Sequence, residues 1–229
     1  MTKQPPTHTR DKILGLAVPF FATVGFEGVS MRDVAAAVRL TPAALYYHFS
    51  DKEQLYLDAV GYAFKEKVEP LKSLLDGGGT PWDRLEAFVA RFTRMLAKEK
   101  DVRRLMQWVL LDSDEQRLRK LADCVFLDLF NALRKLAGEL APGHDVYLLV
   151  VSMIGLVMYP FETQSVRRLL PGHLRKHEDP EAIARHVVGL LRNGLGGTSE
   201  EEPRQRPVSK IRPSARGRRT LLHTRKEKK

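Results

Sequence analysis

Residues 40–55, LTPAALYYHFSDKEQL, decide the fold because they hold two helix starts and a cluster of aromatic side chains. Thr41-Pro42 is typical of an N-cap followed by proline at the first helical position, where a missing N–H is tolerated. Ser50, followed three residues later by Glu53, predicts a capping box and a second helix. Residues 46–49 put two tyrosines, a histidine and a phenylalanine on a short helix. That much aromatic surface needs an explanation.

Two further helices are predicted before this segment. Apolar residues recur at helical spacing from about residue 9 to 24, and the pattern stops at Gly25. Ser30 predicts a cap for a short helix over residues 31–38, and a short turn joins this helix to residues 42–48. The second and third helices therefore have the layout of a helix-turn-helix motif, in which the later helix enters the major groove of DNA.

The start of the helix over residues 42–48 suits contact with bases. Pro42, Ala43 and Ala44 are small, so the helix can sit deep in the groove and offer apolar surface to thymine methyl groups. Thr41 lies at the N-cap, where the helix dipole favours a phosphate.

The end of this helix suits contact with the DNA backbone, because its polar aromatic side chains can donate hydrogen bonds to phosphate oxygens. These donors are Tyr46, Tyr47 and His48. Lys52, at the start of the next helix, is a further candidate for a phosphate contact. Leu45 and Phe49 are expected in the small core, and the alternative is that all the aromatic residues serve only as core.

Residues 10–60 resemble the DNA-binding domain of the tetracycline-repressor (TetR) family. The matching pattern is Ile13-Leu14, Ala17, Phe21, Gly25-Phe26, Ser30, Val34-Ala35, Leu45-Tyr46-Tyr47-His48-Phe49, Lys52-Glu53 and Leu55. The resemblance implies a homodimeric, all-α regulator that binds palindromic operators and releases them on binding a small molecule. It places DNA contacts at Thr41, Pro42, Ala43, Tyr46, Tyr47, His48 and Lys52.

Two residues depart from the family pattern. The family usually has glycine in the turn where this chain has Arg39, and a positive φ there would disfavour arginine. Alternatively the turn is rewound, or Arg39 reaches the phosphate backbone, so Arg39 joins the candidate DNA contacts. Pro19 lies inside the first helix, where it should free the Gly15 carbonyl and bend the helix.

The rest of the chain also reads as helices, so the predicted fold class is all-α. The helix that follows Ser50 should kink or end at Pro70, and Ser113 predicts the cap of a long helix to about residue 140. The most apolar helix is expected over residues 144–170 with a bend at Pro160, and a last helix over residues 179–193. The predicted domains are a helix-turn-helix domain (1–50), a helical effector-binding and dimerisation domain (51–197) and a basic disordered tail (198–229).

The helix around residues 146–161 is hydrophobic on all sides and must be covered all round. A partner protomer is the natural cover. We therefore expect this helix and the one near residues 181–193 to form a four-helix bundle in a homodimer. The alternative is an ordinary core helix.

Aromatic and flexible methionine side chains in the middle helices suit a small, apolar effector. The candidates are Phe92, Met95, Met106, Trp108, Cys124, Phe126, Phe130, Tyr147, Met153 and Met158. For each of them the alternative is simple core packing, and Cys124 is expected to be an inert core thiol.

Composition excludes several classes of protein. Cys124 is the one cysteine, which excludes an internal disulfide, and no catalytic, nucleotide-binding or metal-binding motif occurs. His173 and His177 have metal-ligand spacing but fall in a predicted loop without a third ligand. We expect no enzyme activity, cofactor or metal site, and no signal peptide or membrane span, hence a cytoplasmic protein.

The charge of the chain points to a polyanionic partner. The formal net charge is +10, and residues 198–229 supply +7 of it through eleven Lys or Arg and four Glu. We expect such a tail to add nonspecific attraction to phosphates, and the alternative is a solvated tail with no role. The sequence thus predicts a DNA-binding transcriptional regulator, interpreted as a repressor, and the alternative is an activator. The rivals are an architectural protein that coats nucleic acid without a ligand, and an enzyme.

Overall fold

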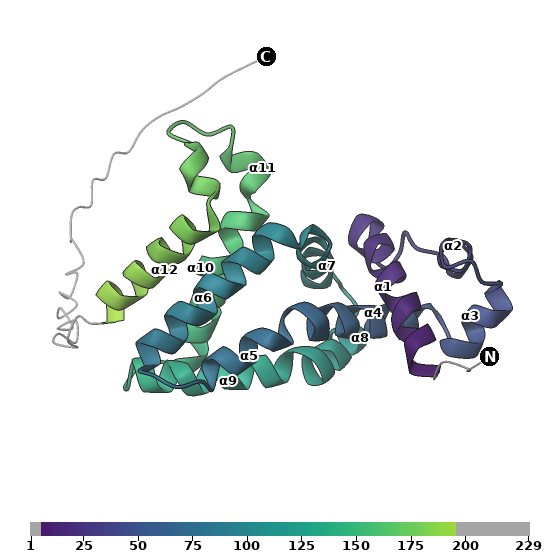
Figure 1. Ribbon diagram of the computed structural model, residues 1–229, viewed down its shortest axis with the longest axis horizontal. Helices are drawn as coiled ribbons and strands as arrows, with labels where there is room; N and C mark the ends of the chain where they lie inside the picture. Colours follow the sequence, from purple (N-terminus) through teal and green to yellow (C-terminus); the bar gives the residue numbers. More distant parts are fainter. Residues whose placement is uncertain (1–5, 196–229) are drawn as a thin grey trace, which may run out of the picture. The chain divides into compact units, whose positions relative to one another are not determined.

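The computed structural model describes residues 6–195, with side chains from Thr9 onward, and this part of the chain is helical without a strand (Figure 1). The α-helices are α1 (Pro6–Val24), α2 (Met31–Ala37), α3 (Pro42–His48), α4 (Lys52–Lys67), α5 (Glu69–Leu75), α6 (Pro81–Lys98), α7 (Lys100–Leu110), α8 (Glu115–Leu121), α9 (Leu127–Leu140), α10 (Val146–Glu162), α11 (Gln164–Arg167) and α12 (Pro180–Leu195). A π-helical segment, η1 (Ala122–Phe126), joins α8 to α9, and a 3₁₀ turn, η2 (Arg175–Glu178), precedes α12. The all-α prediction is confirmed, and the predicted tail lies outside the described residues.

The first three helices form a small bundle at one end of the described chain (Figure 1). The hydroxyl of Ser30 accepts a hydrogen bond from the Asp33 N–H, and that of Thr41 accepts one from the Ala44 N–H, at 3.2 and 3.1 Å. Gly25 ends α1 with a φ of 71°, a conformation that glycine adopts without strain. The predicted starts of α2 and α3 and the end of α1 are therefore confirmed.

Two predicted caps are shifted by one residue. Asp51, not Ser50, caps α4 by accepting from the Gln54 N–H at 2.8 Å, and Asp114, not Ser113, caps α8 by accepting from the Arg117 N–H at 3.0 Å. A carboxylate in this position also interacts favourably with the positive end of the helix dipole.

Of two further predicted helix boundaries, one is confirmed and one is wrong. Pro70 lies in the first turn of α5, and the helix is interrupted between Lys67 and Glu69, as predicted. The long helix predicted over residues 144–170 is wrong, because α10 ends at Glu162. The Thr163 hydroxyl donates to the Tyr159 carbonyl at 2.7 Å, and the leucines at 169 and 170 are exposed, so no buried face continues the helix.

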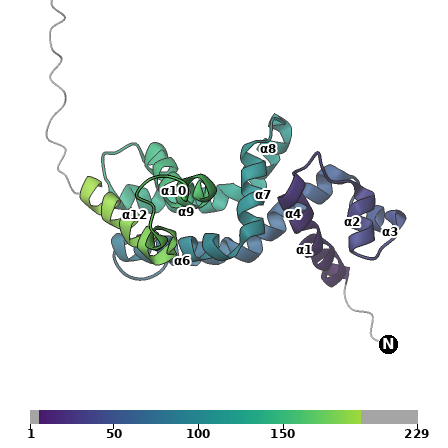
Figure 2. The same ribbon diagram turned by 90° about the horizontal axis from the view of Figure 1, so that it is seen from above.

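The larger part of the chain packs α6 against α12, α5 and α10, with α9 beside α5 and α10 (Figure 2). It meets the small bundle at α1, which packs on α4 and on α7, and α8 with η1 packs on α4 in turn. The buried side chains of both parts form one hydrophobic cluster. Within residues 6–195, we find no helix whose length and apolar content would let it cross a bilayer.

Candidate nucleic-acid interface

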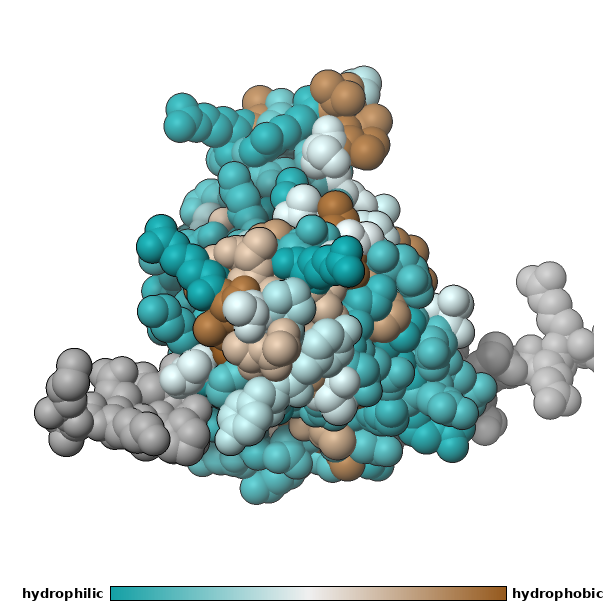
Figure 3. Space-filling view, turned by 90° about the vertical axis from the view of Figure 1, so that its right-hand side faces the viewer, coloured by the Kyte–Doolittle hydropathy of each residue, from teal (hydrophilic) through white to brown (hydrophobic). Residues whose placement is uncertain are grey.

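The side chains of α3 divide between core and surface. Leu45 and Phe49 are buried, whereas Tyr46 and Tyr47 are 51% and 87% exposed. Exposed as well are Thr41, Pro42 and Ala43, and Ala44 is half-buried. Core packing therefore explains Leu45 and Phe49 but not the two tyrosines, whose hydroxyl groups are open to a partner. This end of the molecule shows hydrophilic side chains around paler and tan patches (Figure 3).

Arg39 adopts the left-handed conformation that the turn requires. Its φ is 58°, and it is the non-glycine residue with positive φ among those described. The Leu40 N–H donates to the Ala35 carbonyl at 2.9 Å and the Arg39 N–H to the Ala36 carbonyl at 3.1 Å, which is the Schellman pattern at the end of α2. The turn is thus not rewound, and an exposed guanidinium stands at the position where glycine would fit best.

Lys52 and His48 are partly engaged inside the protein. The Lys52 ammonium lies 4.2 Å from the ring centroid of Phe26 and 3.9 Å from a carboxylate oxygen of Glu27. His48 is half-buried and its ring contacts those of Tyr47 and Phe49. Both side chains border the exposed part of α3, so they remain candidate phosphate contacts with a packing role as well.

The cap of α4 adds a negative charge beside this surface. The Gln54 N–H, and then the Ser50 hydroxyl, lower the pKa of Asp51 below its usual value of 3.8. Asp51 is therefore ionised at neutral pH and would repel phosphates. A DNA backbone would have to approach from the side of α3.

Trp108 links the larger helical part to the small bundle. Its indole N–H donates to the Ala22 carbonyl near the end of α1 at 3.3 Å. A Cβ built on Gly25 would lie 2.7 Å from the Trp108 ring, so this glycine is needed for the close approach as well as for its positive φ. Sequence reasoning assigned Trp108 to an effector pocket, whereas the structure places it against the end of α1.

A buried ion pair makes a second link. Arg117 donates two hydrogen bonds to Asp112, from Nε at 2.5 Å and from Nη2 at 2.7 Å, and both side chains are less than a tenth exposed. The guanidinium also lies 4.0 Å from the ring centroid of Phe26, just after α1, and 6.0 Å from that of Tyr56 on α4. Burial, and then the Asp112 charge, raise the pKa of Tyr56 to about 12. Sequence reasoning missed this cluster, because its members come from three separate stretches of the chain.

The residues predicted to hold an effector lie in different parts of the structure. Phe92, Met95 and Met153 are buried in the core, and Tyr147 is exposed on α10 with its ring against that of Phe130. The remaining candidates that pack partly buried against the core are Met106, Phe126, Phe130 and Met158. Cys124 is exposed rather than buried, because Val125 and Phe126 face α4 and leave the preceding residue outside.

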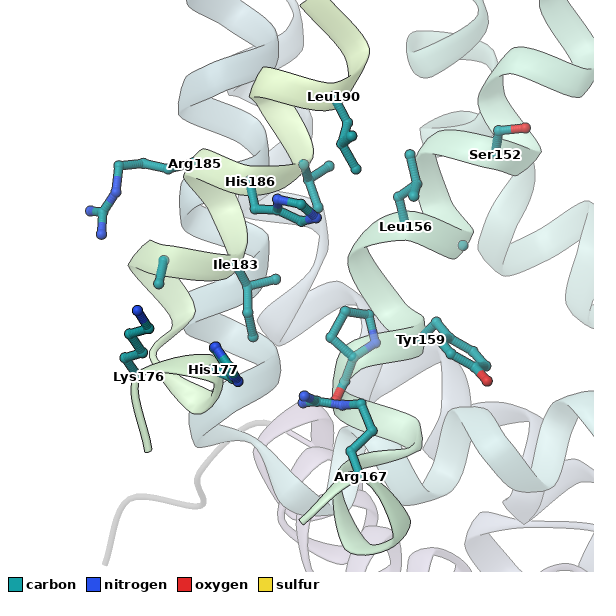
Figure 4. A pocket seen from close by; sticks show the side chains of 14 residues that line it. Ser152, Leu156, Tyr159, Arg167, Lys176, His177, Ile183, Arg185, His186 and Leu190 are labelled. Atoms are coloured by element: carbon teal, nitrogen blue, oxygen red, sulfur yellow. The ribbon is translucent and has the colours of Figure 1, made fainter. Parts of the chain in front are cut away.

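A groove with a volume of about 1070 Å³ lies between α10 and α12 and reaches to α11 and η2 (Figure 4). Its apolar wall includes Leu156 and Ile183, and Arg167 and His177 stand at one end. None of the predicted effector contacts lines it. Sequence reasoning missed the groove because its residues come from helices and turns that meet only in the folded chain.

The exposed helix α3, its Thr41 cap and the Schellman turn before it form a helix-turn-helix motif. Residues 13–59 match the model of the bacterial regulatory proteins of the tetR family. This match begins within α1, covers α2 and α3 and ends within α4.

The chain is similar to the HTH-type transcriptional repressor KstR2 of Mycolicibacterium smegmatis, with 28% identity over 131 residues, which are 57% of this chain and 61% of the repressor. It spans less than two thirds of the length of the curated relatives it matches. Two solved structures show the same fold. FadR from Bacillus subtilis in complex with stearoyl-CoA has a TM-score of 0.68 at 18% identity, covering 80% of this chain and 98% of FadR. AibR in complex with isovaleryl coenzyme A and operator DNA has a TM-score of 0.63 at 24% identity, covering 80% of this chain and 97% of AibR.

Proposed function

We propose that the protein is a homodimeric transcriptional repressor that binds a palindromic operator and leaves it when a small molecule with a substantial apolar part binds the helical domain. The observation that carries the proposal is the division of α3, which buries Leu45 and Phe49 and exposes Tyr46 and Tyr47. The match of residues 13–59 to the tetR family model supports it, as does the name of KstR2 as a repressor.

In this proposal the first turn of α3 meets base edges and its surroundings meet phosphates. Pro42, Ala43 and Ala44 offer small apolar surface to the bases. The phosphate contacts are Arg39, Thr41, Tyr46, Tyr47, His48 and Lys52. Phosphate contacts position the protein on DNA without reading sequence, so their loss should weaken binding to all operators alike.

The proposed dimer uses the exposed face of α10. Leu148, Val151 and Tyr159 are 60%, 48% and 64% exposed and lie on one side of the helix with Gly155, while Val150 and Val157 are buried on the other. A row of exposed apolar side chains of this kind is typical of an interaction surface. A second copy packed there would pair two recognition helices for half-sites about 34–36 Å apart.

The dimer is tested by sedimentation analysis of Leu148→Glu. A charge at the first position of the row should convert the protein to monomers and abolish tight operator binding. Leu169→Glu is the matched control, because Leu169 is 84% exposed and lies beyond α11, outside the row. A dimer that is unchanged by Leu148→Glu would remove α10 from the interface.

Two observations support release by a small molecule. AibR and FadR were solved with acyl-coenzyme A thioesters, and AibR with operator DNA as well. In this chain, Trp108 and Arg117 connect the larger helical part to the end of α1 and to Phe26. A ligand that favours one arrangement of α7 and α8 would therefore change the pose of the recognition helix.

The operator is identified by selecting bound sequences from random duplex DNA. A regulator should prefer one palindrome about 10³-fold or more over other DNA, whereas an architectural protein should not. Tyr46→Phe should then weaken operator binding about tenfold or more, since hydrogen bonds to charged groups contribute about 1.5–3 kcal/mol. Tyr147→Phe is the control, being exposed on α10 away from α3. Equal affinity of the wild type and Tyr46→Phe would contradict the phosphate contact.

A further inference from the structure

Phe26 lies where three stretches of the chain meet. It follows Gly25 at the end of α1, and its half-buried ring contacts a cation from the start of α4 and another from α8. The Lys52 ammonium lies 4.2 Å from the ring centroid, and the guanidinium carbon of Arg117 lies 4.0 Å from it. One aromatic ring therefore contacts both a candidate phosphate contact and a buried side chain of the larger helical part.

The Arg117 side of this cluster is rigid. The guanidinium donates two hydrogen bonds to Asp112 in the corner between α7 and α8, and both side chains are buried. The ring of Tyr56 on α4 meets that of Phe26 edge to face, with 5.3 Å between their centroids. Close-packed side chains transmit displacements to their neighbours. A shift of the corner between α7 and α8 must therefore move Arg117 against the Phe26 ring or move the ring with it.

The Lys52 side is held less firmly. Among the described residues, the acidic partner of Lys52 is Glu27, whose carboxylate oxygen lies 3.9 Å away and whose side chain is 88% exposed. A pair with such an exposed partner contributes little. The neighbouring Glu53 is engaged by Lys120 of α8, whose ammonium donates to it at 2.6 Å. The Phe26 ring is therefore the main feature that fixes the Lys52 ammonium.

The position of the Lys52 ammonium affects how much a phosphate contact contributes to binding. A free lysine side chain loses rotamer entropy when it contacts a phosphate, whereas a side chain that is already held by a ring loses less. Two cations over one ring also repel each other, so the position of Arg117 affects how firmly the ring holds Lys52. A movement of α8 can thus change the phosphate contact without any change within α3.

We propose that Phe26 is a positioning residue, which holds Lys52 for a DNA phosphate and makes the position of Lys52 depend on Arg117 of α8. Phe26 itself touches no DNA and acts through Lys52. The inference rests on the proposed function, and it names one contact through which the larger helical part regulates DNA binding. The alternative is that the Phe26 ring only fills space between α1, α4 and α8.

A double-mutant cycle on DNA affinity separates the two roles of Phe26. Phe26→Leu keeps apolar bulk but removes the ring, and it should weaken operator binding about two- to fivefold for each copy bound, as expected for one cation–π contact. In a Lys52→Gln background the same change should have no further effect. Phe26→Tyr keeps a ring and should restore the affinity that Phe26→Leu loses. An equal loss from Phe26→Leu in both backgrounds is the result of a space-filling role and would overturn the proposal.

NMR of the full-length protein reads the position of Lys52 without DNA and without a change at Phe26. Reductive methylation with labelled formaldehyde gives each lysine a methyl signal and keeps its positive charge. The Lys52 signal is identified by its absence in Lys52→Gln. Because the face of an aromatic ring shields nearby nuclei, this signal should lie upfield of those of the exposed lysines. A Lys52 signal among those of the exposed lysines would overturn the proposal.

The link to α8 is tested by changing Asp112→Asn and Arg117→Gln together, which removes both charges of the buried pair at once. The Lys52 signal should shift, because the second cation no longer lies over the ring. Lys120→Gln is the matched control: it breaks the exposed contact between α8 and Glu53 and should leave the Lys52 signal in place. A Lys52 signal that the double change does not move, or that both changes move equally, would overturn the link.

These measurements distinguish a failure of this inference from a failure of the proposed function. A dimer that prefers its operator but loses affinity equally in both backgrounds overturns the role of Phe26 alone. If the protein shows no operator preference, the cycle is measured on any duplex, because phosphate contacts carry no sequence information. A shielded Lys52 signal and a loss that requires Lys52 would then support the role of Phe26 and overturn the repressor proposal.

Discussion

Replacing Arg117 by methionine should strongly destabilise the folded protein. The substitution keeps the bulk and apolar stem of the side chain but removes two hydrogen bonds to Asp112 and the contact with the Phe26 ring. Asp112 is then left with its side chain 5% exposed and without its partner. Breaking a buried pair in this way costs about 3–5 kcal/mol, because the remaining charge stays desolvated. For a chain of this size, this lowers the melting temperature by about 6–20 °C.

The effect should depend on pH. In the wild type the hydrogen bond from Arg117 lowers the pKa of Asp112 below its ordinary 3.8, so the pair stabilises the fold above that value. This contribution is lost as the pH falls through the lowered pKa of the folded state. In Arg117→Met burial should instead raise the pKa of Asp112, so the folded variant takes up a proton. The difference between the two proteins should therefore be largest near neutral pH and shrink as the pH falls toward 3.8.

The assay is urea and thermal unfolding followed by circular dichroism at several pH values. Arg119→Met is the matched control on the same helix, since Arg119 is 72% exposed and pairs with Glu115 at 2.8 Å. An exposed pair contributes about 1 kcal/mol or less. Adding Asp112→Asn to Arg117→Met removes the buried charge and should restore part of the stability. If the two single methionine variants were equally stable at neutral pH, the ascribed role of the buried pair would be refuted.

Three further changes probe other features. Arg39→Gly should raise the free energy of unfolding by about 0.5–1 kcal/mol, since glycine is unstrained at a φ of 58°, and should weaken operator binding at low salt; unfolding and binding titrations measure the two effects. Gly25→Ala should lower the free energy of unfolding by about 2–3 kcal/mol, because the new Cβ would lie 2.7 Å from the Trp108 ring and the backbone φ is 71°. A shift in tryptophan fluorescence should accompany the loss of stability. Deleting residues 198–229 should flatten the slope of log affinity against log salt, and an unchanged slope would remove this segment from DNA binding.

Local signals predicted the helices of the N-terminal bundle well. Thr41 and Ser30 cap helices through contacts only three residues away, and Gly25 ends α1 through its own backbone freedom. Such features depend on neighbours in sequence, so one chain is enough to recognise them. The positive φ of Arg39 was one of the alternatives considered for the turn, and the structure selects it.

Features that depend on distant residues were not predictable in this way. Trp108 and Ala22 are far apart in the sequence, and nothing in the helix around Trp108 indicates whether it faces a pocket or α1. The same holds for the groove, whose wall joins Leu156 with Ile183. The caps at Asp51 and Asp114 could not be predicted to the exact residue. Serine and aspartate are equally good N-caps, so packing determines whether the serine or the aspartate that follows it caps the helix.

The π-helical turn at Ala122–Phe126 sets the rotational phase between α8, which packs on α4, and α9, which packs on α5 and α10. Removing one residue there and closing the turn to α-helix would leave this phase nearly unchanged, because an i→i+5 turn holds about one residue more than an i→i+4 turn. Leu133 and Leu136, now almost fully buried, would stay buried, whereas the same deletion in the first turn of α9 would rotate everything after it by about 100°. A single-residue deletion should therefore be tolerated better in this short stretch than at the start of α9.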